Sequence, residues 1–400
     1  MNLPHCILLT LCAATQLFGQ PVEVPVPPEI IDPPWMASRR QAQIDGADSL
    51  RVFHGFSLTD RLTESRISFV HRVVDDAGRS YKPAHYDHGN GVSVADVDGD
   101  GRPDLYFSNQ AGSNQLWRNL GDGSFADITA AAGVAVTGAV GVTSSFADID
   151  NDGDADLYVT NVRSPNVLFE NDGSGHFSDV MEGSSLGYDG HSSGAVFFDY
   201  DRDGRLDLFL CVVGIYTTDE QRTVVNDATT TSREPGEFQF YSAVKNAFGG
   251  HLQPERLRHS RLYRNLGGLR FVDVTEASGL LDDGFSGDAA PVDVNDDGWL
   301  DLYVLNMQGH DHYWENDGNG GFVDRSRQVF PNTSWGAMGI QVFDVDNDGH
   351  QDIFISDMHS DMSTEVGPER EKLKSEITWE EDFLATAGQS VFGNTLFRNR

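Results

Sequence analysis

Residues 96–104 read Asp-Val-Asp-Gly-Asp-Gly-Arg-Pro-Asp, with acidic side chains at positions 1, 3, 5 and 9 and glycine at position 6. The same pattern begins again at Asp148, Asp199, Asp293 and Asp344. Most intervals between successive copies are about 51 residues long, and one is nearly twice that length. A motif that returns at a fixed interval indicates a fold built from repeated supersecondary units.

Each motif is followed by further signatures in a fixed order. A hydrophobic run comes first, then a segment that ends in asparagine, such as residues 116–119 (Leu-Trp-Arg-Asn), and then a Phe-x-Asp segment such as residues 125–127. Glycine-containing turns separate these short runs. The unit is therefore expected to hold four short strands, which is the layout of a propeller blade. The sequence predicts an all-β protein, a β-propeller of four-stranded blades with five repeats, the last of them incomplete.

Two repeats are longer than the others between the acidic motif and the asparagine signature. The extra residues are about 213–259 in the third repeat and about 354–390 in the fifth. Helical spacing of apolar residues after Gly367 predicts a short surface helix in the second insertion. Because long loops on a regular scaffold often carry recognition, both insertions are candidate contact regions.

The acidic loop predicts one calcium site in each repeat. Oxygens at positions 1, 3, 5 and 9, with the backbone carbonyl at position 7, offer about five or six hard ligands, a set that suits Ca²⁺ better than Mg²⁺ or Zn²⁺. Glycine at position 6 permits the sharp turn of the loop. The predicted side-chain ligands are Asp96, Asp98, Asp100, Asp104, Asp148, Asp150, Asp152, Asp156, Asp199, Asp201, Asp203, Asp207, Asp293, Asn295, Asp297, Asp301, Asp344, Asp346, Asp348 and Asp352. The predicted carbonyl ligands belong to Arg102, Asp154, Arg205, Trp299 and His350.

A single loop of this kind is usually a solvated turn, but five copies in the same phase indicate a shared partner. Without a cation, three or four carboxylates in one loop would repel one another strongly. Asn295 gives the fourth loop one charge fewer, so that loop is expected to bind most weakly. Repetition in every blade favours up to five structural ions over a signalling sensor.

The composition excludes several classes of protein. The 400 residues contain 62 acidic and 28 basic side chains, which give a formal net charge of −34. Such a surface repels a phosphate backbone, so nucleic acid is not expected as a partner. With 39% hydrophobic and 10% aromatic residues, the chain can still build a core. Only three cysteines occur, and Cys211 lies in an apolar run where a buried core thiol is expected.

The N-terminal region is expected to lie outside the folded domain. Residues 1–20 resemble a secretory signal peptide, residues 21–59 are predicted to be a proline-rich linker, and residues 60–400 are predicted to form the propeller. No other segment has 18 consecutive apolar residues, so no membrane span is expected. The expected location is secreted, extracellular or periplasmic, and anchoring at a cell surface remains open.

The repeats resemble the FG-GAP/VCBS type of calcium-loop blade, which is also found in integrin α-chain propellers. More narrowly, the stretch from Ile67 through residues 91–96, the Leu-Trp-Arg-Asn signatures and residues 357–362 (Asp-Met-His-Ser-Asp-Met) are similar to the cartilage acidic protein/ASPIC–UnbV group. The resemblance covers roughly residues 60–400. It implies a secreted propeller, generally of seven blades, followed by an ASPIC/UnbV domain that is not present in this sequence. It implies interaction or adhesion and no established reaction.

Two functions therefore compete. The first is an interaction or adhesion scaffold whose inserted loops contact a protein or a glycan. The second is an extracellular propeller enzyme, a polysaccharide hydrolase or lyase, with histidine and aspartate side chains at the mouth of the channel. Candidate residues for the second are His85, His88, His310 and His359. These histidines are more typical of solvent-facing loops, so no catalytic residue is assigned, and convergence of the four would favour the enzyme.

Overall fold

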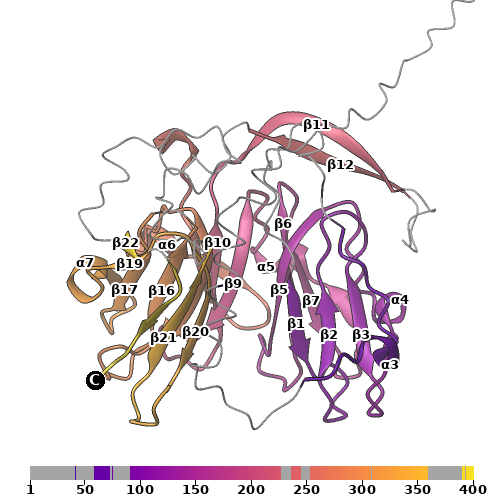
Figure 1. Ribbon diagram of the computed structural model, residues 1–400, viewed down its shortest axis with the longest axis horizontal. Helices are drawn as coiled ribbons and strands as arrows, with labels where there is room; N and C mark the ends of the chain where they lie inside the picture. The colour runs from indigo at the N-terminus through magenta and orange to yellow at the C-terminus, as the bar shows by residue number, and fades with distance from the viewer. Residues whose placement is uncertain are drawn as a thin grey trace, which may run out of the picture.

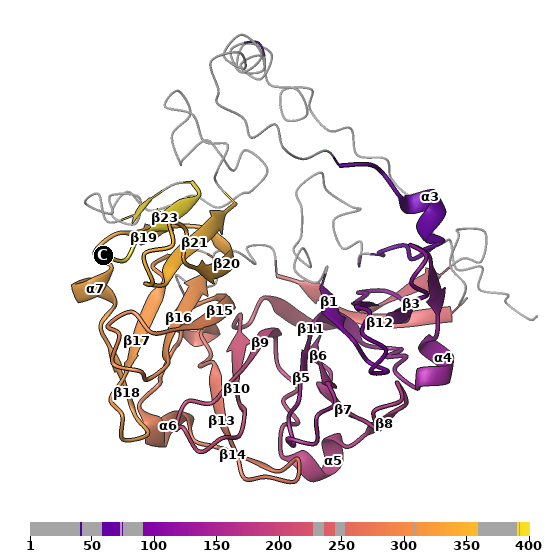
Figure 2. The same cartoon turned by 90° about the horizontal axis from the view of Figure 1, so that it is seen from below.

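The computed structural model describes residue 41 and residues 58–72, 74, 91–226, 236–244, 253–307, 309–358, 390–391 and 393–400. Antiparallel sheets in consecutive order along the chain form an arc around a common centre (Figure 2). The predicted all-β propeller of four-stranded blades is confirmed. The signal peptide at residues 1–20, nearly all of the linker at residues 21–59 and the helix expected after Gly367 lie outside the described residues.

Each blade is a meander of short strands joined by tight turns. Blades 1 and 2 contain β1 (Val92–Ala95), β2 (Asp104–Phe107), β3 (Gln115–Asn119), β4 (Phe125–Asp127), β5 (Val140–Ala147), β6 (Asp156–Val162), β7 (Val167–Asn171) and β8 (Phe177–Asp179). Blades 3 and 4 contain β9 (Ser192–Phe198), β10 (Asp207–Val212), β13 (Arg261–Asn265), β14 (Phe271–Asp273), β15 (Ser286–Val292), β16 (Asp301–Asn306), β17 (His312–Asn316) and β18 (Phe322–Asp324). Blade 5 contains β20 (Ala337–Phe343), β21 (Asp352–Asp357) and β23 (Thr395–Phe397).

Short helices and one parallel strand pair lie between the blades or at their edges. One-turn helices follow the outer strands or precede the first blade: α3 (Leu62–Ser65), α4 (Thr129–Ala132), α5 (Met181–Ser184), α6 (Thr275–Ser278) and α7 (Ser326–Val329). A parallel pair joins β19 (Thr333–Ser334) to β22 (Ser390–Val391). No strand forms at the described positions between residues 66 and 74, although the Phe69 ring stacks on Phe107 at 4.7 Å.

Antiparallel pairing places the acidic loops and the insertions at opposite ends of the blades. Each acidic loop joins the first strand of a blade to the second, whereas each insertion follows the second strand. In blade 3 the insertion forms a hairpin of β11 (Thr217–Asn226) and β12 (Gly236–Ala243), and the short 3-10 helix η3 (Pro254–Arg256) precedes β13. Figure 1 shows this hairpin crossing one end of the propeller. We call this end the insertion end and the opposite end the loop end.

Four apolar clusters join neighbouring blades. Between blades 3 and 4, for example, Phe209 and Cys211 pack with Leu302 and Val304, and all four side chains are fully buried. Cys211 is thus the core thiol that the sequence predicted. A fifth cluster lies at the insertion end, where Tyr216 and Phe240 of the insertion pack with side chains from several blades. Successive side chains of β10, which is buried along its whole length, pack on opposite sides: Phe209 and Cys211 join one cluster, and Leu208 and Leu210 join the next.

Candidate metal centres

The five acidic loops share one backbone arrangement. In the second loop, Asp148 Oδ1 accepts a hydrogen bond from the Asp152 N–H at 3.0 Å, and its Oδ2 accepts one from the Gly153 N–H at 3.1 Å. The equivalent pair forms in the other four loops. Gly153 has a φ of 99°, a backbone conformation that residues with a β-carbon rarely adopt. The position-1 carboxylate therefore holds the turn of the loop through two backbone hydrogen bonds.

This turn brings carboxylates together in four loops. Each group offers oxygens that lie within 4.8 Å of one another. The groups are Asp96, Asp98 and Asp104; Asp148, Asp150 and Asp152; Asp199, Asp201 and Asp203; and Asp344, Asp346 and Asp348. In the fourth loop Asn295 replaces the central acid, and its Nδ2 donates to Asp297 Oδ2 at 2.9 Å.

The position-9 aspartate is buried and ties its loop to the blade. Asp207 is fully buried; its Oδ2 accepts the Tyr200 N–H at 3.2 Å and its Oδ1 accepts the Asn265 N–H at 2.8 Å. The same two bonds form at Asp104, Asp156, Asp301 and Asp352. Burial raises the pKa of Asp156 and of Asp207 to about 7 and that of Asp301 to about 6. A carboxylate oxygen has a second lone pair, so these groups can still face an ion.

In blades 2 to 5, the asparagine that ends the second signature links neighbouring loops, a role that the sequence alone did not reveal. Asn265 Nδ2 donates to the Leu206 carbonyl of its own blade and to the Ile149 carbonyl in the loop of blade 2, both at 2.9 Å. Asn171, Asn316 and Asn399 make the equivalent bond to the preceding blade. The sequence shows that this asparagine recurs in every repeat. Its partner is a backbone carbonyl of another repeat, which no sequence pattern identifies.

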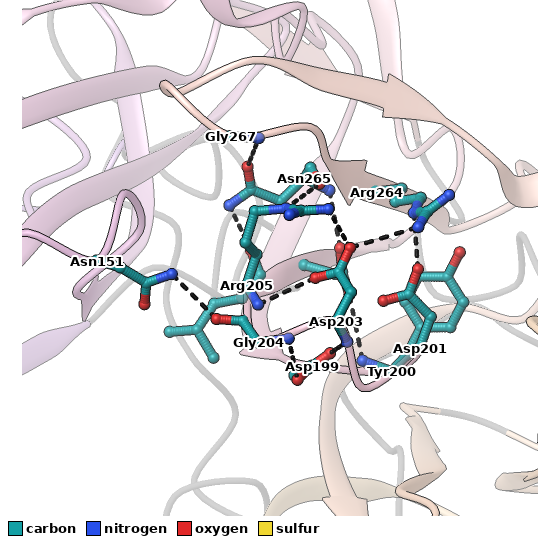
Figure 3. A network of polar contacts seen from close by, with 12 residues as sticks. Asn151, Asp199, Tyr200, Asp201, Asp203, Gly204, Arg205, Arg264, Asn265 and Gly267 are labelled. Carbon is teal, nitrogen blue, oxygen red and sulfur yellow. Dashed lines mark hydrogen bonds and ion pairs between the residues drawn. The ribbon is translucent and has the colours of Figure 1, made fainter.

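The position-3 carboxylates of blades 1 and 3 are incompletely satisfied. Asp98 Oδ1 and Asp201 Oδ1 are buried and have no hydrogen-bond partner. Their other oxygens face arginines, with Arg118 Nε at 3.4 Å from Asp98 Oδ2 and Arg264 Nε at 2.7 Å from Asp201 Oδ2 (Figure 3). A buried anionic oxygen without a partner is costly, so a cation in the loop would remove this penalty.

The position-7 residues contact their loops through backbone N–H groups. The N–H groups of Arg102, Asp154, Arg205, Trp299 and His350 each donate to the position-5 side chain of the same loop, at 2.8–3.0 Å. Their carbonyls remain predicted ligands. Some side chains reach a neighbouring loop: His350 Nδ1 lies 2.7 Å from Asp296 Oδ2, and the Arg202 guanidinium lies 5.0 Å from the centre of the Trp299 ring.

These donor sets fit a hard divalent cation. They consist of carboxylate oxygens on a turn that needs glycine, and no histidine or cysteine belongs to the described carboxylate groups. Oxygen ligands of this kind match Ca²⁺, which tolerates irregular coordination, better than Zn²⁺. A bound ion would supply the positive charge that each loop lacks, while the residues of the chain would fix its position.

The raised pKa values predict opposite effects of pH on the calcium-free and calcium-loaded protein. Asp156 and Asp207 have a pKa of about 7, above the usual value of 3.8, so folding takes up protons and calcium-free stability should fall as pH rises from about 4 to about 7. Calcium requires the ionised carboxylates, so its stabilising effect should grow over that range. Urea unfolding between pH 5 and pH 8, with EGTA or with excess calcium, measures the difference. Parallel pH profiles would contradict ion binding at these loops.

The histidines proposed for an active site can be compared only in part. His85, His88 and His359 lie outside the described residues. His310 Nδ1 lies 3.0 Å from an Arg327 guanidinium nitrogen, and burial together with this cation lowers its pKa to about 4. The neighbouring His312 Nδ1 lies 2.6 Å from the fully buried Asp282, whose other oxygen accepts hydrogen bonds from Ser260 and Ser286. These contacts join blade strands and loops, as expected of a packing network.

Comparison with known proteins agrees with the repeat structure. The family described as FG-GAP-like repeat matches residues 96–159, 148–210 and 293–355. Cartilage acidic protein 1 of Mus musculus is 32% identical over 148 residues, which is 34% of this chain and 23% of the relative. Cartilage acidic protein 1 of Homo sapiens is 30% identical over 127 residues, which is 31% of this chain and 19% of the relative.

Two solved structures also match this chain at low identity. The V. cholerae biofilm matrix protein Bap1 is 14% identical, with a TM-score of 0.34 over 69% of this chain and 36% of that one. An Agrocybe aegerita lectin, described as recognising non-reducing terminal N-acetylglucosamine, is 17% identical, with a TM-score of 0.30 over 68% of this chain and 77% of that one.

The fold and the loops define this chain as a β-propeller with FG-GAP-like repeats. It is related to cartilage acidic protein 1, which confirms the resemblance predicted from the sequence. The chain spans only about a fifth of the length of these curated relatives. Among the described residues, no helix is both long and apolar enough to cross a membrane.

Proposed function

We propose that this protein is a secreted, calcium-stabilised propeller scaffold that binds a protein or glycan at its insertion end. The observation that carries the proposal is the recurrence of three carboxylates within 4.8 Å at the same place in four blades. Such groups repel one another unless a cation lies between them. The kinship with cartilage acidic protein 1 and the signal-like residues 1–20 support an extracellular location, where free calcium is abundant.

The hairpin of the third blade supports the placement of the binding surface. Arg163, in the loop after β6, donates to the Thr218 carbonyl at 2.6 Å and pairs with Asp219 at 2.8 Å, and its guanidinium lies 3.8 Å from the centre of the Tyr241 ring. Together with the buried side chains of Tyr216 and Phe240, these contacts hold the hairpin in one position. A surface that is already ordered binds a ligand with a smaller loss of entropy.

Calcium binding is tested by isothermal titration of metal-free protein. We expect more than one calcium ion to bind, and the double variant Asp150→Asn with Asp152→Asn should lose one site, because it removes two charges from the second loop. The exposed Asp189→Asn, in the same repeat, is the matched control and should leave the stoichiometry unchanged. A titration without binding heat at any temperature, confirmed by equilibrium dialysis, would overturn the proposal.

Recognition at the insertion end is a separate part of the proposal with its own test. Calcium-loaded protein is applied to arrays of glycans and of extracellular proteins, and each hit is repeated with a variant in which residues 217–243 are replaced by a short Gly-Ser linker. Binding that depends on the hairpin supports the proposed surface. Binding that survives the replacement would place the ligand elsewhere on the scaffold.

A further inference from the structure

The residue that precedes the asparagine of the second signature differs in charge from blade to blade. It lies near the end of the third strand in blades 1 to 4 and directly after β23 in blade 5, one residue before the asparagine whose N–H bonds the position-9 aspartate. The residues are Arg118, Glu170, Arg264, Glu315 and Arg398. Blades 1, 3 and 5 therefore present a cation at this place, whereas blades 2 and 4 present an anion.

In the odd-numbered blades the arginine contacts the acidic loop directly. Arg264 Nε lies 2.7 Å from Asp201 Oδ2, and a terminal nitrogen of the same guanidinium lies 3.3 Å from Asp203 Oδ2 (Figure 3). Arg118 contacts Asp98 in the same way at 3.4 Å. Arg398 pairs with Asp346, and it lies 3.7 Å from Asp348. These arginines occupy carboxylate oxygens that the calcium ion would otherwise use.

The loops of blades 1 and 3 hold a second arginine, at position 7. Arg102 pairs with Asp100, and Arg205 pairs with Asp203. In each of these two loops, two guanidinium groups therefore lie beside the four carboxylates and offset part of their negative charge. The arginines do not fill the loops, because Asp98 Oδ1 and Asp201 Oδ1 still lack a partner. These oxygens can still bind calcium, but the nearby guanidinium groups reduce the negative potential that attracts the ion.

The loop of blade 2 has the opposite character. Position 7 is a fifth acid, Asp154, and the third-strand residue is Glu170, which occupies in β7 the place that Arg264 occupies in β13. Within the described part of the chain, no basic side chain forms an ion pair with this loop or with Glu170. In blade 4, Glu315 lies 3.5 Å from Arg325 of the same blade, which offsets part of its charge.

We infer that the third-strand residue and the position-7 residue together set the order in which the loops take up calcium, with blade 2 filled first and blades 1 and 3 filled last. The inference rests on the proposed calcium binding and adds a specific affinity to each site. A divalent ion interacts twice as strongly with each neighbouring charge as a monovalent ion does, so replacing a nearby cation by an anion changes affinity steeply. This order differs from the one expected from Asn295, because the loop sequences alone omit the arginines from the third strand.

Exchanging the charges tests this order. Metal-free protein is titrated with calcium in competition with a fluorescent chelator, and the individual affinities are fitted. Glu170→Arg is expected to weaken the tightest site about tenfold or more, and Arg264→Glu to strengthen one of the weakest sites by a similar factor. Glu182→Arg and Arg61→Glu are the controls, because they change the net charge equally at exposed positions away from the loops. They should leave every affinity within about twofold.

The outcomes separate the inference from the function on which it rests. If the wild-type protein binds no calcium, the proposed function itself fails. If it binds calcium but both charge exchanges leave the affinities unchanged, or change them no more than the controls do, only the proposed order fails. If circular dichroism shows that either variant misfolds, Glu170→Gln or Arg264→Gln is used in its place. The calcium affinity of each site must then change in the same direction, by a smaller factor.

Discussion

In calcium-free buffer the protein is expected to melt about 10 °C below its melting temperature in excess calcium. An ion that binds only the folded state, at a concentration one hundred times its dissociation constant, contributes about 2.7 kcal/mol to stability. Two such sites already contribute about 5 kcal/mol, and a chain of this size gains roughly 2 °C per kcal/mol. The carboxylate groups in four blades supply more than two candidate sites, so the difference in melting temperature should be at least this large.

The measurement is a calorimetric or fluorescence melt with EGTA, with excess calcium, and with EGTA plus excess magnesium. Magnesium keeps its water shell and prefers smaller octahedral sites, so it should restore little of the lost stability. Calcium added back to the EGTA sample should restore all of it. Equal melting temperatures with EGTA and with calcium would show that the loops are stable without ions, and the carboxylate groups would then need another explanation.

The blade and its acidic loop could be predicted from the sequence because both depend on residues close together in the chain. The Asp-x-Asp-x-Asp-Gly pattern determines a local turn, and the strands around it follow from short apolar runs that end at glycine-rich turns. The position-1 aspartate binds N–H groups only four and five residues away. Local rules of this kind repeat in every copy, so five copies gave the same prediction five times.

The contacts between blades could not be predicted in this way. The bond from Asn265 to Ile149 joins residues 116 positions apart, and the arginines face their loops across separate strands. Predicting such pairs requires the register of the sheet and the packing angle between blades, which no single repeat contains. The sequence marked Asn265 and Arg264 as recurring residues but left their partners unidentified. For the same reason, it ranked the loops by Asn295 alone.

Asn265→Ala is expected to lower the free energy of unfolding by about 3 kcal/mol or more. The Asn265 side chain is completely buried, and its amide is the donor to two carbonyls in different blades, Ile149 and Leu206. Its Oδ1 accepts the Gly267 N–H at 2.8 Å (Figure 3). The truncation leaves these buried groups without partners, and each such group costs about 1–3 kcal/mol.

Asn119→Ala is the matched control, because Asn119 occupies the same position in blade 1. Its amide donates to Pro103 of its own blade at 3.1 Å, its Oδ1 accepts the Gly121 N–H at 3.0 Å, and its side chain is partly exposed to water. Water can replace these bonds, so the loss should be about 1 kcal/mol. Urea unfolding of both variants in saturating calcium measures the two values. Because the two variants differ mainly in the bond to the neighbouring blade and in burial, equal losses would mean that the asparagine stabilises its own turn and contributes little to joining the blades.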